Sequence, residues 1–171
     1  WLYDSTGFLG GLLFGLVYSP IVVTGLHQSF PAVELSLIAQ GGSFIFAIAS
    51  MANVAQGAAT LAVFLCAHEG KLKGLAGASA ASALMGITEP ALYGVNLPKR
   101  YPLIAAMIGG ASGGLYAGLT QTHRFATGSS GLPAVLLYIG GDTMQYFINI
   151  LIALAISVAV TIAVTLALAP R

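Results

Sequence analysis

The chain has 171 residues, of which 57% are hydrophobic and 6% are charged, and its formal net charge is +1. Soluble domains carry about 25% charged residues, so this composition excludes a soluble globule, and the small net charge excludes a large basic face for nucleic acid. The apolar runs are continuous rather than alternating, which predicts an all-α integral membrane protein and argues against a transmembrane barrel. The single cysteine, Cys66, excludes a disulfide framework and a cysteine metal site.

Long apolar stretches predict four full membrane spans, each long enough to cross a hydrocarbon core. The expected spans are 7–26, 42–67, 103–119 and 148–169. Pro20 is expected to kink the first of them. Asn53 and Gln56 interrupt the second, which is therefore either one helix with a polar face or two half-helices.

Shorter interrupted segments lie between these spans. Residues 29–42 are expected to form a broken or interfacial helix, and residues 132–147 a bent or re-entrant piece. Short hydrophobic segments broken by glycine and proline are typical of discontinuous helices that line a transport site.

The stretch GITEPALYGVNL (86–97) places a carboxylate, Glu89, in a region that otherwise predicts membrane. Basic residues lie on both sides of it, in the loops 68–74 and 98–102. Basic residues in short loops favour the cytoplasmic side. We therefore expect both loops on that side and residues 75–97 to form a re-entrant hairpin with Glu89 near its tip.

An ionisable residue at membrane depth indicates function by default. An ionised carboxylate can accept hydrogen bonds from two neighbouring sugar hydroxyls, and such charge-assisted bonds are strong. Pro90 restrains the preceding residue towards extended backbone, so we expect it to end the incoming half-helix at Glu89. The alternatives are that Glu89 caps a half-helix or pairs with Arg100. A proton relay would need only the carboxylate, so the neighbouring Thr88 favours direct ligand contact.

Other polar residues are weaker candidates. His27 offers one donor and one acceptor and can accept a proton, but it is equally explained as an interfacial histidine bound to water. Asn53 and Gln56 lie three residues apart on one helical face, where they either reach a substrate or hydrogen-bond another helix. His68 and His123 are expected to be solvated. The three histidines lack metal-ligand spacing, so no metal site and no cofactor are predicted.

Three further features leave alternatives open. Glycines spaced four apart, Gly110, Gly114 and Gly118, predict either a helix dimer or a close helix contact within the chain, and we favour the second. Glu34 is a candidate for burial but also fits a water-facing position. Asp142, which follows two glycines, is expected in a turn or a cap.

The stretch 86–97 resembles the GITEP signature of the IIC membrane component of the bacterial phosphoenolpyruvate-dependent sugar phosphotransferase system, glucose superfamily. The stretches VVTGLHQSFPAVELSLI (22–38), SMANVAQGAATLAVF (50–64) and AAMIGGASGGLYAG (105–118) agree with it. Together they are most similar to the sucrose-type branch of the sucrose, trehalose and β-glucoside porters. Trehalose and N-acetylmuramic acid porters are similar in the same stretches.

This resemblance implies a dimer of ten-helix protomers whose C-terminal half carries the sugar on re-entrant hairpins. Residues 1–171 resemble only that half, and the absence of an initiator methionine agrees with a piece of a longer protein. By the same resemblance Glu89 binds the sugar hydroxyls, Thr88 assists and His27 is the second polar contact. Glu89 or His27 then orients the reacting hydroxyl or takes its proton. The phosphoryl donor is a phosphocysteine of a soluble IIB partner, and Cys66 is not expected to replace it.

We therefore expect a permease component in the bacterial cytoplasmic (inner) membrane that binds a glucoside disaccharide, with sucrose as the expected sugar. Its partners are the disaccharide, the IIB phosphocarrier, the lipid bilayer and, in the full-length protein, a second copy. The alternative is an ion-coupled sugar transporter in which Glu89 carries a proton or the substrate. A third possibility is a membrane assembly subunit that binds no sugar and uses its glycine-rich helix for assembly.

Overall fold

The computed structural model describes residues 2–139 and 144–170, and every regular element in these residues is helical. The α-helices are α1 (Leu2–Thr24), α2 (Phe30–Ala39), α3 (Ile45–Cys66), α4 (Gly70–Leu84), α5 (Glu89–Ala91), α6 (Leu97–Lys99), α7 (Tyr101–Leu119) and α8 (Gln145–Leu168). Two 3-10 helices, η1 (Leu26–Ser29) and η3 (Leu132–Tyr138), and one π-helix, η2 (Leu92–Asn96), lie between them.

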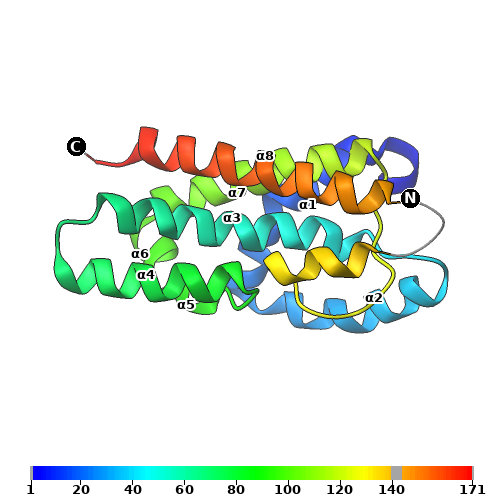
Figure 1. Ribbon diagram of the computed structural model, residues 1–171, viewed down its shortest axis with the longest axis horizontal. Helices are drawn as coiled ribbons and strands as arrows, with labels where there is room; N and C mark the ends of the chain where they lie inside the picture. Colours follow the sequence, from blue (N-terminus) through cyan, green and yellow to red (C-terminus); the bar gives the residue numbers. More distant parts are fainter. Residues whose placement is uncertain (1, 140–143, 171) are drawn as a thin grey trace.

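Among the described residues, four helices are long and apolar enough to cross a membrane, which confirms the predicted number of spans. Their spanning parts are Gly7–Thr24, Ile45–Cys66, Tyr101–Leu119 and Gln145–Leu168. Figure 1 shows α3, α7 and α8 running along the long axis of the molecule, with the two chain ends at opposite ends of it. Helix α3 is central, since 83% of its spanning part is buried. It is one continuous helix, Ile45–Cys66, and not the two half-helices that the sequence analysis left as an alternative.

Glycines bring α1 and α7 into direct backbone contact. Three pairs face each other in antiparallel order, Gly7 with Gly118, Gly11 with Gly114, and Gly15 with Gly110. A Cβ atom on Gly11 or Gly114 would overlap the carbonyl oxygen of the other. Gly113 contacts α8, where a Cβ would lie 2.9 Å from the carbonyl oxygen of Ala153. The predicted helix contact within the chain is therefore confirmed, and it lets helices approach closely without a hydrophobic driving force between them.

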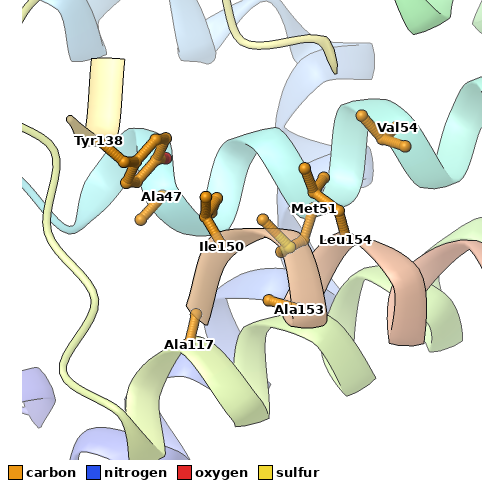
Figure 2. Close-up of a cluster of buried hydrophobic side chains, with 8 residues drawn as sticks. All are labelled: Ala47, Met51, Val54, Ala117, Tyr138, Ile150, Ala153 and Leu154. Carbon is orange, nitrogen blue, oxygen red and sulfur yellow. The ribbon is translucent and has the colours of Figure 1, made fainter. Parts of the chain in front are cut away.

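The largest core cluster joins α3, α7, α8 and η3 (Figure 2). Its members are Ala47, Met51, Val54, Ala117, Tyr138, Ile150, Ala153 and Leu154. Small side chains alternate with larger ones, so the helices interdigitate. The Tyr138 hydroxyl donates to the carbonyl oxygen of Phe46 at 3.4 Å, which fixes η3 against α3.

Two shorter arms lie on one side of α3. One is formed by η1 and α2, and the other by α4 and the helices that follow it up to α6. In the view of Figure 1, α4 and α2 lie beneath α3, α4 towards the left and α2 towards the right, and they approach each other near the middle of the long axis. After the turn at residues 85–88, α5 and η2 pack back along α4, and α6 continues from η2 to α7. Helix α4 and the helical run after the turn contain the segment 75–97 that was predicted as a re-entrant hairpin, and the placement of this hairpin in the bilayer stays a prediction.

The turn of this hairpin corrects the prediction made for Pro90. Helix α4 ends at Leu84, and Gly86 makes the turn with a φ of +104°, a conformation that favours glycine. Glu89 is helical rather than extended, and Pro90 lies in the first turn of α5. Proline is well placed there because its missing N–H would have no helical partner.

A loop follows α7 and leads to η3, which precedes α8. Arg124 lies in this loop and forms an isolated antiparallel bridge with Ser43, which precedes α3. His123 is partly buried, with its ring 6.2 Å from that of Tyr146, so it is less exposed than predicted, whereas His68 is exposed as expected. Asp142 lies outside the described residues.

Candidate functional site

Glu89 and His27 approach each other where the two short arms meet. Helix α1 ends at Thr24, and Gly25, with a φ of +79°, turns the chain into η1, which carries His27. Glu89 begins the helical run after the hairpin turn. The distance from His27 Nε2 to Glu89 Oε1 is 4.0 Å, and the two side chains are 18% and 48% exposed. The pair is therefore accessible from the surface of the described chain.

The side chains of this pair lie close together without a hydrogen bond between them. A separation of 4.0 Å exceeds hydrogen-bond length, so the ring and the carboxylate do not satisfy each other. The position of Glu89 in a first helical turn favours its negative charge. A hydroxyl group that lies beside the pair, at hydrogen-bond distance from both atoms, can donate to Glu89 and contact the ring of His27.

The surroundings of His27 agree with a polar contact at this ring. Its Nε2 lies 3.3 Å from the amide nitrogen of Gln28. Its Nδ1 is buried and has no hydrogen-bond partner among the described residues. Buried nitrogen atoms are normally satisfied, so the ring is held in place without its full set of hydrogen bonds.

Thr88 and Tyr93 fix the start of the helical run α5–η2–α6, which carries Glu89. Thr88 is 5% exposed, and its carbonyl oxygen accepts a 2.8 Å hydrogen bond from the amide of Leu92. The Tyr93 hydroxyl lies 3.2 Å from the carbonyl oxygen of Val23 and donates to the end of α1. This bond ties the arm that carries Glu89 to the helix that precedes His27.

Asn53 and Gln56 lie in hydrogen bonds between segments. The Asn53 amide donates to Ser130 Oγ at 2.6 Å. The Gln56 amide donates to Ser19 Oγ at 2.8 Å, and its Oε1 accepts from the Asn96 amide at 2.6 Å. Both side chains are 5% exposed or less. The structure therefore brings Thr88, Glu89 and His27 together but directs these two amides into contacts across the bundle, and a substrate role for them stays a prediction.

Asn96 is a buried polar residue that the sequence analysis did not single out. It has no exposed surface, and its Oδ1 accepts a hydrogen bond of 3.0 Å from Thr60 Oγ1. Together with Gln56 it joins the π-helix η2 to α3. Asn96 belongs to the 86–97 stretch, and an asparagine in an apolar run was the available signal.

A buried ion pair joins Glu34, a predicted candidate for burial, to Arg124, which the sequence analysis did not single out. Arg124 and Glu34 are 0% and 2% exposed, and two guanidinium nitrogens donate to the two carboxylate oxygens. The guanidinium carbon lies 4.4 Å from the centre of the Phe46 ring. Glu34 is therefore buried and does not face water. Nothing in the polar sequence around Arg124 indicated that its side chain would be buried.

Other polar groups give no competing site chemistry. No cluster of three histidine, cysteine or acidic side chains that could hold a metal occurs among the described residues. A cavity of about 320 Å³ borders His123 and Tyr146, and one of about 260 Å³ borders Cys66 and His68. Neither cavity is lined by Glu89 or His27.

Comparison with known proteins agrees with the motifs. Residues 1–110 match the family described as Phosphotransferase system, EIIC. The chain is 49% identical over 159 residues to the sucrose-specific EIIBC component of the PTS system of Staphylococcus xylosus, covering 89% of this chain and 33% of that protein. It is 48% identical over 157 residues to the sucrose-specific EIIBC component of Bacillus subtilis, covering 90% and 34%.

A more distant relative is the β-glucoside-specific EIIBCA component of the PTS system of Bacillus subtilis, 38% identical over 157 residues, covering 91% of this chain and 26% of that protein. The chain spans about one third of the length of the sucrose-specific relatives. No solved structure matches the chain.

Proposed function

This chain belongs to the phosphotransferase system EIIC family, and on that premise we propose that it forms the sugar-binding part of a sugar permease whose substrate is sucrose. Relatives named for sucrose are up to 50% identical to it, against 38% for the relative named for β-glucosides. Four membrane-spanning helices support a multi-pass protein, and we place it in the bacterial cytoplasmic membrane. The full-length protein is proposed to be a homodimer in the lipid bilayer.

The approach of His27 and Glu89 to 4.0 Å is the observation that carries the proposed site. Glu89 accepts hydrogen bonds from adjacent sugar hydroxyls, because an ionised carboxylate has several acceptor positions. His27 contributes Nε2 as an acceptor, and a sugar hydroxyl would take the place of the Gln28 amide that lies 3.3 Å from this atom. Thr88, buried beside the turn, fixes the start of the helix that presents Glu89.

We propose that phosphorylation follows at the cytoplasmic side. The phosphoryl group of a IIB phosphocysteine is transferred to a sugar hydroxyl, so a phosphorus–sulfur bond breaks and a phosphorus–oxygen bond forms. The hydroxyl proton passes to Glu89 or His27. Several relatives are named EIIBC or EIIBCA, which supports a IIB partner. Cys66, exposed at the end of α3, is not proposed as the donor.

The two competing interpretations receive less support. The family match and the relatives give no support to ion-coupled transport. An assembly subunit built around the glycine-rich helix is disfavoured because glycines of α7 already contact α1 within the chain.

Sugar binding by the full-length purified protein tests this proposal. Calorimetry compares sucrose, trehalose and a β-glucoside for wild type, Glu89→Gln and the control Glu69→Gln, whose carboxylate precedes α4. We expect selective sucrose binding that Glu89→Gln weakens by about 10- to 100-fold, the range for lost hydrogen bonds to a charged group. The control should retain wild-type affinity.

Phosphorylation provides the second readout. With the phosphoenolpyruvate-dependent phosphorylation chain supplied, Glu89→Gln should lower sucrose phosphorylation. Full binding and full phosphorylation by this variant would show that the site assignment is wrong. Uptake that follows the proton gradient and ignores phosphoenolpyruvate would instead establish the ion-coupled alternative.

A further inference from the structure

The buried Arg124 side chain holds several segments at once. Besides its two hydrogen bonds to Glu34, it donates through Nη1 to the carbonyl oxygen of Ser129 at 3.0 Å. Its backbone N–H and carbonyl exchange hydrogen bonds of 2.9 and 3.0 Å with Ser43, which precedes α3. Stacking on Phe46 covers the guanidinium face. The side chain is thus fixed from α2, from the start of α3 and from its own loop.

The same loop rests directly on the hairpin turn that precedes Glu89. Ser129 Oγ donates to the carbonyl oxygen of Met85 at 3.0 Å. A Cβ atom on Gly86 would lie 2.5 Å from Ser129 Oγ, and one on Gly131 would lie 2.5 Å from the carbonyl oxygen of Leu84. These contacts leave no space between loop and turn, so a displacement of the loop is transmitted to the turn.

The other end of the ion pair leads to His27. Glu34 lies in α2, which continues from η1 without an intervening residue, and His27 lies in η1. A continuous path therefore runs from His27 through α2, Glu34, Arg124 and the loop to the turn before Glu89.

We propose that the Glu34–Arg124 ion pair is a positioning pair that sets the separation of His27 and Glu89 and thereby the affinity of the sugar site. The sugar-binding consequence rests on the proposed function, whereas the geometric consequence does not. The two-pronged bond to Glu34 is specific to the planar guanidinium, so lysine cannot reproduce it. Small displacements of binding groups have large effects on ligand affinity and reactivity.

Distance measurement between the two arms tests the geometric part. Spin labels are placed at Leu26, directly before His27, and at Ile87, two residues before Glu89, in full-length protein carrying Cys66→Ser. These two side chains are 65% and 61% exposed. The distance distribution is then compared for the parent and for Arg124→Lys. We expect a broader or shifted distribution for Arg124→Lys, and an unchanged distribution overturns the proposal.

A second variant keeps the test decisive if a buried lysine prevents folding. Ser129→Ala removes the bond from the loop to the hairpin turn and leaves the ion pair in place, and it should also shift or broaden the distribution. The control Ser157→Ala removes a buried 3.0 Å hydrogen bond from α8 to α3, away from both arms. It should lower thermal stability without changing the distance, which separates positioning from general destabilisation.

Sucrose affinity of unlabelled protein tests the functional part. Arg124→Lys and Ser129→Ala should each weaken sucrose binding by roughly 10-fold, within the range for residues that act through a packed network, and Ser157→Ala should not. Wild-type affinity in a folded Ser129→Ala variant overturns the proposal. If wild type binds no sucrose, the proposed function fails, while the distance distributions still confirm or reject the positioning pair.

Discussion

Replacement of Gly114 by alanine tests the contact between α1 and α7. The added Cβ would overlap the carbonyl oxygen of Gly11 on one side and would lie 3.2 Å from Cγ2 of Ile48 on the other. Since α1 and α3 press on it from two directions, α7 cannot shift away from one without approaching the other. Overpacking of this kind costs roughly 1–3 kcal/mol, and the gain of up to about 1 kcal/mol from replacing a helical glycine offsets only part of it.

The measurement is thermal unfolding of the full-length protein in detergent, with Gly74→Ala as the matched control. Gly74 also lies in a helix, α4, but a Cβ built there meets nothing within 4 Å. We expect Gly114→Ala to lower Tm by several degrees and Gly74→Ala to leave Tm unchanged or raise it. Equal Tm values for the two variants would refute the conclusion that backbone contact at Gly114 holds these helices together.

Two further substitutions address the arm that returns from the hairpin turn. Asn96→Ala leaves the buried Oε1 of Gln56 without its 2.6 Å partner and should destabilise the protein by about 1–3 kcal/mol; an unchanged midpoint of unfolding in denaturant would contradict this. Arg100→Gly relieves a residue with a φ of +64° between α6 and α7 and should raise stability by up to about 1 kcal/mol; a lower Tm would show that the arginine side chain contributes more than the strain costs.

Hydropathy located the four spanning helices because each is a continuous apolar run of sufficient length, a property that survives any arrangement in space. The hairpin turn was harder to place because proline has two compatible roles. It can follow the end of one helix or lie in the first turn of the next. At Pro90 the second role is realised, and Gly86 rather than Pro90 makes the turn.

The Glu34–Arg124 pair shows what sequence reasoning could not supply. Its members are 90 residues apart, in a short helix and in a loop that both read as compatible with water. Nothing in either local pattern identifies the other as its partner. Pairing followed from tertiary packing, where Phe46 and Ser43 complete the enclosure of the guanidinium. Burial of one member alone would be strongly unfavourable, so the two residues are buried together.

Four polar residues in the apolar part of the chain form two pairs. The presence or absence of a hydrogen bond between the two members distinguishes the pairs. Gln56 and Asn96 bond each other at 2.6 Å and are almost fully buried, so their polar atoms are used within the fold. Glu89 and His27 stop 4.0 Å apart and remain partly exposed, although a small movement would bring them into contact. The fold holds the first pair in a hydrogen bond and the second pair apart, so Glu89 and His27 stay available for the proposed hydroxyl-rich ligand. Gln56, Glu89 and His27 were singled out from the sequence, but Asn96 was not. The distances assign Gln56 and Asn96 to packing, and a binding role for Glu89 and His27 stays a prediction.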